Sequence, residues 1–160
     1  MAIKVGDRVP NATFTVMTAE GPKPRTSDEI FKGKKVVLFA VPGAFTPTCH
    51  KNHMPGFVKN ADAIKAKGIS TIAVTGVNDV FVMDAWKKAS SGDAIEFLAD
   101  GSASFAKALG LTADLTERGL GVRSQRYAMV VDDGVVKTLN IEDAPGKAEV
   151  SSADNLLKSL

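Results

Sequence analysis

The feature that most constrains the fold is a run of six apolar residues at 36–41, VVLFAV. A strand covered on both faces has no polar side, so such a run is typical of a strand buried inside a parallel sheet. Pro42 and Gly43 follow it and end the strand. A second apolar run, ISTIAVTGV at 69–77, predicts another buried strand. Two buried strands separated by a segment with helical periodicity indicate an α/β fold.

The rest of the chain predicts further strands and helices around these two runs. Strands are predicted at 11–17, 95–99, 126–131 and 135–141. Helices are predicted from Pro47 to Gly68 with a kink or break at Pro55-Gly56, at 80–90, within 100–110 and after Ser151 or Ser152, and a short helical turn at 27–30. An extended lead-in is expected at 1–10, and loops are expected at 18–24 and 111–121. The pattern therefore predicts an α/β sandwich with a mixed central sheet, as one domain of residues 1–160.

Composition excludes several classes of protein. The 20 basic and 18 acidic residues give a net charge of +2, which gives no reason to expect nucleic acid or an anionic membrane as a partner. A single cysteine rules out an internal disulfide, and two histidines are too few for most histidine-based metal sites, so no metal is expected. The first ten residues contain no apolar signal core, and no cofactor motif is evident. We therefore expect a soluble, cytoplasmic protein without a cofactor.

The single cysteine, Cys49, falls at a predicted helix start. Thr46 is a favourable N-cap and Pro47 suits the first helical position, which puts Cys49 in the first turn. Unpaired N–H groups and the positive end of the helix dipole favour a thiolate there, whereas a free thiol has a pKa of about 8.5. A lone cysteine is also often only a small buried apolar residue. Position alone leaves both interpretations open.

The residues around Cys49 resemble a known active-site pattern. PGAFTPTC at 42–49 is similar to the Pro-x-x-x-Thr-x-x-Cys motif of peroxiredoxins. HMPGF at 53–57, VND at 77–79, FVM at 81–83, AW at 85–86, RYAMVV at 126–131 and DG at 133–134 resemble the peroxiredoxin-5 or type II subgroup, in order and at matching spacings. The similarity covers nearly the whole chain. It implies a thioredoxin-like fold and reduction of hydroperoxides.

The resemblance also implies roles for individual residues. Cys49 would be the peroxidatic cysteine, whose thiolate attacks a peroxide oxygen and becomes a sulfenic acid. Thr46 would hydrogen-bond the peroxide, and Arg126 would support the thiolate and the charge on the leaving oxygen. Pro42 would shield the sulfur, and Arg123 is a weaker candidate for the role of Arg126. The other residues expected around the substrate are Thr48, Phe45 and His53.

The sequence departs from many relatives in lacking a resolving cysteine. The positions where family members carry one correspond here to valine, around Val74 and Val150. An external thiol would then have to resolve the sulfenic acid at Cys49. Glutathione, alone or with glutaredoxin, is the first candidate and thioredoxin the second. We expect a homodimer only because members of the resembled subgroup often form one.

Three other interpretations compete with the peroxidase. The chain could be a peroxide sensor or redox relay that forms a mixed disulfide with a partner protein and is oxidised once, without steady turnover. A thioredoxin-like disulfide reductase is disfavoured because the chain has no Cys-x-x-Cys motif. A purely structural domain would leave the lone cysteine slow to react with peroxide.

Overall fold

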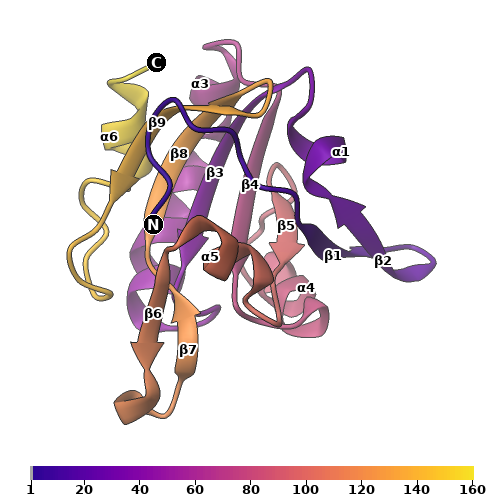
Figure 1. Cartoon of the computed structure of the whole chain (residues 1–160), viewed down its shortest axis with the longest axis vertical. Helices are drawn as coiled ribbons and strands as arrows, with labels where there is room; N and C mark the ends of the chain where they lie inside the picture. Colours follow the sequence, from indigo (N-terminus) through magenta and orange to yellow (C-terminus); the bar gives the residue numbers. More distant parts are fainter. Residues whose placement is uncertain (1) are drawn as a thin grey trace.

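The computed structural model describes residues 2–160, and Met1 of the predicted lead-in lies outside the described residues. A seven-stranded mixed sheet with the strand order β2-β1-β5-β4-β3-β8-β9 forms the centre of the molecule (Figure 1). Its middle strands are β3 (Lys35–Val41) and β4 (Thr71–Gly76), which run parallel to each other. These are the two apolar runs of the sequence, and residues 36–41 are fully or almost fully buried. The predicted mixed sheet is therefore confirmed.

The other strands extend the sheet on both sides of this pair. On one side β5 (Glu96–Ala99) runs parallel to β4, and β1 (Thr13–Thr18) pairs antiparallel with β5. On the other side β8 (Tyr127–Asp132) and β9 (Val135–Ile141), both predicted as strands, form an antiparallel hairpin. The sheet thus places the end of β3 and the start of β8 next to each other, since Ala40 pairs with Tyr127.

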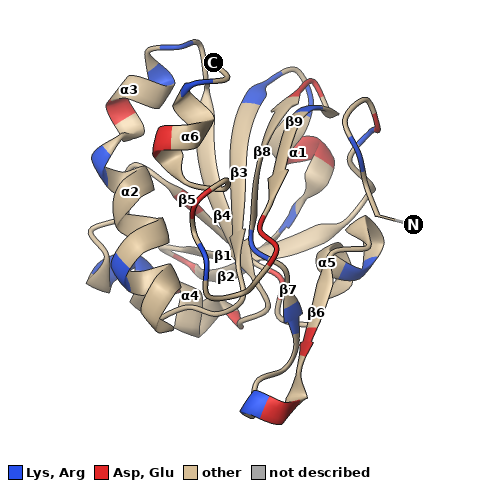
Figure 2. Ribbon diagram, turned by 90° about the vertical axis from the view of Figure 1, so that its left-hand side faces the viewer, with Lys and Arg blue, Asp and Glu red and all other residues tan. Residues whose placement is uncertain are grey.

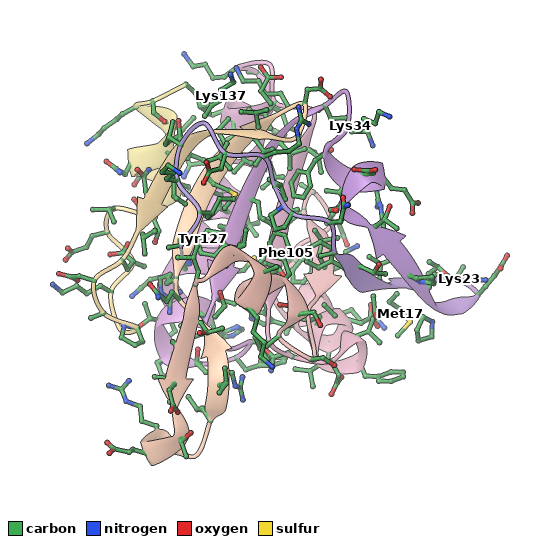
Figure 3. The ribbon with its side chains drawn as sticks, viewed as in Figure 1. Met17, Lys23, Lys34, Phe105, Tyr127 and Lys137 are labelled. Carbon is green, nitrogen blue, oxygen red and sulfur yellow. The ribbon has the colours of Figure 1, made fainter. Side chains whose placement is uncertain are left out.

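Helices cover both faces of the sheet and bury an apolar cluster on each. The first face packs against α2 (Met54–Lys59), α3 (Ala61–Lys65), α4 (Val80–Ala89) and α6 (Ala153–Leu157). The second packs against α1 (Ser27–Phe31) and α5 (Ser104–Leu109), and Phe105 lies close to Tyr127 on this face (Figure 3). Asp79 caps α4 and Ser152 caps α6 by accepting backbone N–H groups, and the helix after Ser152 was predicted. Among residues 2–160, no helix is long and apolar enough to cross a membrane.

The prediction of a loop at 18–24 is wrong. The segment lies mostly in β2 (Gly21–Thr26), which pairs with β1 as a hairpin. Pro22 and Pro24 argued against a strand because proline has no N–H to donate. β2 is the edge strand, however, and backbone groups of a strand point alternately toward and away from its partner. Two prolines spaced by two residues can both turn their nitrogen toward solvent.

The predicted long loop at 111–121 is also largely a hairpin. It consists of β6 (Thr112–Leu115), the 3-10 turn η2 (Thr116–Arg118) and β7 (Gly121–Ser124). This two-stranded unit is separate from the main sheet and projects from one end of the molecule (Figure 1). Its strands are short, only Leu115 and Ser124 in them are buried, and they lack the apolar alternation by which a strand is recognised.

The helix that begins at Pro47 is interrupted in a different way from the predicted kink. Residues Cys49–His53 form a π-helix, η1, in which the N–H of Met54 donates to the carbonyl of Cys49. Pro55 follows in the first turn of α2 and has no N–H, so the regular hydrogen-bond ladder is interrupted at this point. A second break occurs at Asn60, where α2 gives way to α3. Cys49 thus stands in an irregular helical turn.

Candidate active site

The sulfur of Cys49 lies against the guanidinium of Arg126. β3 ends at Val41, the chain turns through 42–46, and the helix carrying Cys49 then begins at Pro47. The cysteine side chain is fully buried, and Nη2 of Arg126 donates to Sγ at 2.9 Å. The contact places a positive charge directly beside the sulfur in a water-poor site.

Arg126 is only 2% exposed, and hydrogen bonds hold its guanidinium in place. It directly precedes β8, which places it beside the end of β3. Nε and Nη2 donate to the carbonyl of Pro145 at 3.3 and 3.0 Å, and Nη1 lies 2.9 Å from Nδ1 of His53. A buried charge is costly unless it is hydrogen-bonded, and here every guanidinium nitrogen has a partner. The positive charge is thereby fixed next to the sulfur.

His53 is a neutral base beneath this arginine. Its Nε2 lies 2.9 Å from the carbonyl of Ser151, which can only accept, so Nε2 carries the hydrogen and Nδ1 accepts from Arg126. Burial, reinforced by the charge of Arg126, lowers the pKa of His53 to about 3. Its ring also contacts Phe39 and Phe57 edge-on. His53 therefore orients Arg126 without adding charge to the site.

This lowered pKa predicts an acid-dependent loss of stability. Below His53's ordinary pKa of 6.5 the unfolded chain takes up a proton that the folded chain does not bind until about pH 3, so stability falls as the pH drops through this range. Between about pH 7.5 and about pH 5 we expect a loss of about 2 kcal/mol in the free energy of unfolding. Urea unfolding at both values measures it. His53→Gln keeps a donor and an acceptor but does not titrate, so it is expected to show a shallower loss; equal losses would contradict the assignment.

Thr46 lies one helical turn before Cys49. Its hydroxyl donates to the carbonyl of Gly43 at 2.7 Å, and its own carbonyl accepts from the N–H of His50. No N-cap hydrogen bond to the Thr46 hydroxyl is present among the described residues, so the expected capping role is not seen. Gly43 permits this tight turn because a side chain there would come within 3.0 Å of the Thr46 methyl group.

A pocket of about 210 Å³ is lined by Thr46 and Arg126, whereas Cys49 and His53 are not part of its wall. Arg126 both lines it and contacts the sulfur, so the guanidinium connects the pocket to Cys49. Its walls are mainly apolar, with Arg118 and Arg126 as the charged groups. Residues on the wall include Pro42, Thr46, Thr48, Leu115, Leu120 and Pro145.

The other residues predicted around the substrate do not all line this pocket. Thr48 lines the pocket and donates to the carbonyl of Gly146 at 3.1 Å. Phe45 is 47% exposed and is not part of the pocket wall. Its ring is tilted against the ring of His50, with the two centroids 5.6 Å apart. Arg123 donates to the carbonyls of Pro42 and Leu120 and does not reach the sulfur in this structure. Within residues 2–160, no three or more His, Cys, Asp or Glu side chains gather as a metal site would require.

Sequence analysis missed two groups of residues at the site. Pro145 and Ser151 hold Arg126 and His53 through backbone carbonyls, which any residue type supplies, so no side-chain signal marks them. Leu115 and Arg118 reach the pocket from the β6–β7 hairpin. That hairpin was predicted to be a loop, and its position beside Cys49 depends on tertiary structure. In this segment the available sequence signal was the pair of glycines that flank Leu120, Gly119 and Gly121.

Comparison with known proteins gives a consistent family. Residues 4–157 match the model of the Redoxin family. Peroxiredoxin-2E-2, chloroplastic, from Oryza sativa subsp. japonica is 50% identical over 164 residues, which cover 99% of this chain and 72% of the relative. The hybrid peroxiredoxin hyPrx5 of Haemophilus influenzae is 40% identical over 162 residues, which cover 100% of this chain and 67% of the relative.

Solved structures of peroxiredoxins also resemble this chain. The crystal structure of reduced Prx3 in complex with H₂O₂ from Vibrio vulnificus is 54% identical, with a TM-score of 0.94 and coverage of 98% of both chains. Peroxiredoxin 5 from Alvinella pompejana is 35% identical, with a TM-score of 0.85 and coverage of 98% of this chain and 97% of that one. The thioredoxin-like fold and the predicted resemblance are both confirmed. The chain therefore belongs to the Redoxin family, and within it to the peroxiredoxins of the peroxiredoxin-5-like, type II kind, which are thiol peroxidases.

Proposed function

We propose that this chain reduces hydrogen peroxide and alkyl hydroperoxides through Cys49 alone. The observation that carries the proposal is the 2.9 Å contact between Sγ of the buried Cys49 and Nη2 of Arg126, the residue that lines the pocket. The thiolate attacks the terminal oxygen of the peroxide; an S–O bond forms and the O–O bond breaks. Sulfur is oxidised to sulfenic acid, and the leaving oxygen takes up a proton to become water or alcohol. Arg126 faces the negative charge throughout.

Thr46 is proposed to orient the peroxide. Because its hydroxyl hydrogen is already given to Gly43, the oxygen is left with a lone pair for an incoming donor. A hydroperoxide carries its hydrogen on the terminal oxygen, which is the one that the sulfur attacks. A hydrogen bond from that oxygen to Thr46 would hold it within reach of Cys49, one turn along the helix. Pro42 and Thr48 complete the wall, and roles for Phe45 and Arg123 remain predictions.

An external thiol is proposed to complete the cycle. It condenses with the sulfenic acid to give a mixed disulfide and water, and a second thiol then releases Cys49 as thiolate. The chain has no second cysteine, and Val74 is buried within β4. Glutathione, alone or with glutaredoxin, is favoured over thioredoxin because the pocket is small and carries Arg118, whose guanidinium suits a small thiol bearing carboxylates.

Peroxide turnover with defined reductants tests this cycle. We expect continuous consumption of hydrogen peroxide with glutathione or with glutathione and glutaredoxin, and slower consumption with the thioredoxin system. A faster rate with thioredoxin would reverse the order of reductants. Consumption of one equivalent of peroxide per chain, with no steady turnover under any of them, would instead support the peroxide sensor or redox relay.

Assembly and location extend the proposal. We propose that the chain forms a homodimer. Phe45 and Phe81 are 47% and 65% exposed, and these aromatic side chains offer apolar surface that a second copy could cover. Sedimentation equilibrium tests this directly. A cytoplasmic location stays a prediction; two relatives, from Oryza sativa subsp. japonica and Arabidopsis thaliana, at 50% and 47% identity, are named as chloroplastic.

A further inference from the structure

We propose that Glu142 is a positioning residue for the reaction at Cys49. It would hold the loop between β9 and α6 in the conformation that fixes Arg126 and His53. This inference rests on the role of Arg126 in the proposed function. Glu142 touches neither the pocket's apolar wall around Thr46 nor the sulfur, and it acts only through the loop.

The carboxylate of Glu142 ties the two ends of this loop together. Glu142 follows β9 and is only 7% exposed. Its Oε2 accepts three hydrogen bonds, from the N–H of Glu149 at 2.7 Å, the N–H of Ser151 at 2.8 Å and the hydroxyl of Ser151 at 2.7 Å. Its own N–H donates to the carbonyl of Arg126 at 3.0 Å. One residue thus links the β9 end of the loop, its α6 end and the backbone of the catalytic arginine.

The same loop supplies the carbonyls that hold the site. Pro145 accepts from Nε and Nη2 of Arg126, and Ser151 accepts from Nε2 of His53. Gly146 accepts from the hydroxyl of Thr48 on the helix of Cys49. Figure 2 shows this charged segment passing between β9 and α6. Every contact that immobilises the guanidinium, apart from the sulfur, therefore depends directly or through His53 on the path of residues 142–151.

Besides these bonds, the N–H of Lys147 donates to the carbonyl of Ala144, the N–H of Ser152 to that of Glu149, and Nδ2 of Asn155 to that of Val150. Residues 143–150 contain no helix or strand, and most are exposed or half-buried. The ion pair between Asp143 and Lys147 is largely solvent-exposed and so contributes little. Three hydrogen bonds on one buried oxygen hold the loop more firmly than such an exposed pair. Without them the Pro145 carbonyl would no longer be held in place, and Arg126 would lose its fixed distance to the sulfur.

The test compares Glu142→Ala with Glu142→Gln and with the matched control Asp143→Ala. We expect Glu142→Ala to slow the reaction with hydrogen peroxide by roughly 10- to 100-fold, since misplacement by about 1 Å costs that much. Its pH profile is expected to shift to more alkaline pH, because the thiolate loses a well-placed cation. Glu142→Gln retains an oxygen that can accept the same three bonds and is expected to recover most of the rate, and Asp143→Ala is expected to behave as wild type.

Stopped-flow rates across pH, with circular dichroism to verify folding, decide the matter. Should Glu142→Ala fail to fold, Ser151→Ala removes only the hydroxyl bond and is expected to give a smaller shift in the same direction. A folded Glu142→Ala with wild-type rate and pH profile overturns the inference, as does an unshifted profile in Ser151→Ala. Equal losses in Glu142→Ala and Glu142→Gln would also overturn it, since charge and not hydrogen bonding would then matter. A wild-type chain inert toward peroxide would instead defeat the proposed function.

Discussion

Replacing Cys49 by serine is expected to abolish peroxide consumption. The chain has no other cysteine, so no second thiol can take over the reaction. A serine hydroxyl stays protonated at neutral pH even beside the guanidinium of Arg126, and it cannot cycle through a sulfenic acid. The expected rate, measured as loss of hydrogen peroxide in the presence of excess glutathione, is therefore that of the solution without protein.

This variant also separates chemistry from folding. Cys49 is fully buried in the cluster that includes Phe39 and Met54, and serine is slightly smaller and more polar, so a modest loss of thermal stability is expected. Folding is verified by circular dichroism before rates are compared. In the wild type, mass spectrometry after one equivalent of peroxide is expected to find one added oxygen at Cys49. Retained turnover in a folded Cys49→Ser variant would place the reactive group elsewhere.

The sequence predicts those parts of the site that depend on local structure. The run at 36–41 has only apolar side chains, which favours burial, and Thr46-Pro47 is a favourable helix opening, which places Cys49 in a helical turn after β3. Asp133-Gly134 predicts the β8–β9 hairpin because few other residues adopt its turn, and both have positive φ. Arg126 was placed by resemblance; its contact with the sulfur depends on the pairing of β3 with β8.

The parts that could not be predicted depend on backbone groups and on distant segments. The carbonyls of Pro145 and Ser151 hold the site without any requirement for a particular side chain. The π-helical turn at Cys49–His53 has only Pro55 as a local signal, and a proline is equally compatible with an ordinary kink. Glu142 lies 93 residues beyond Cys49 in sequence, and only the folded loop shows what it holds.

Thr46→Val is expected to slow the reaction with hydrogen peroxide by roughly 100-fold. Valine has nearly the shape of threonine, so the pocket wall is kept while the hydroxyl is lost. The peroxide would then have no acceptor to hold its terminal oxygen in line with the sulfur. Alkylation of Cys49 by iodoacetamide needs the thiolate but no such hydrogen bond, so its rate is expected to change far less. The contrast between the two rates isolates substrate orientation from thiol reactivity.

Thr46→Ser is the matched control, because it keeps the hydroxyl that donates to Gly43 and removes only the methyl group. Its peroxide rate is expected to remain within a few-fold of wild type. If Thr46→Val slowed peroxide reduction and alkylation equally, the hydroxyl would be acting on the sulfur or on the helix, and orientation of the peroxide by Thr46 would be excluded. If Thr46→Ser slowed peroxide reduction as much as Thr46→Val, packing of the Thr46 methyl group against Gly43 would be the cause. The methyl group lies so close to Gly43 that a Cβ there would come within 3.0 Å of it.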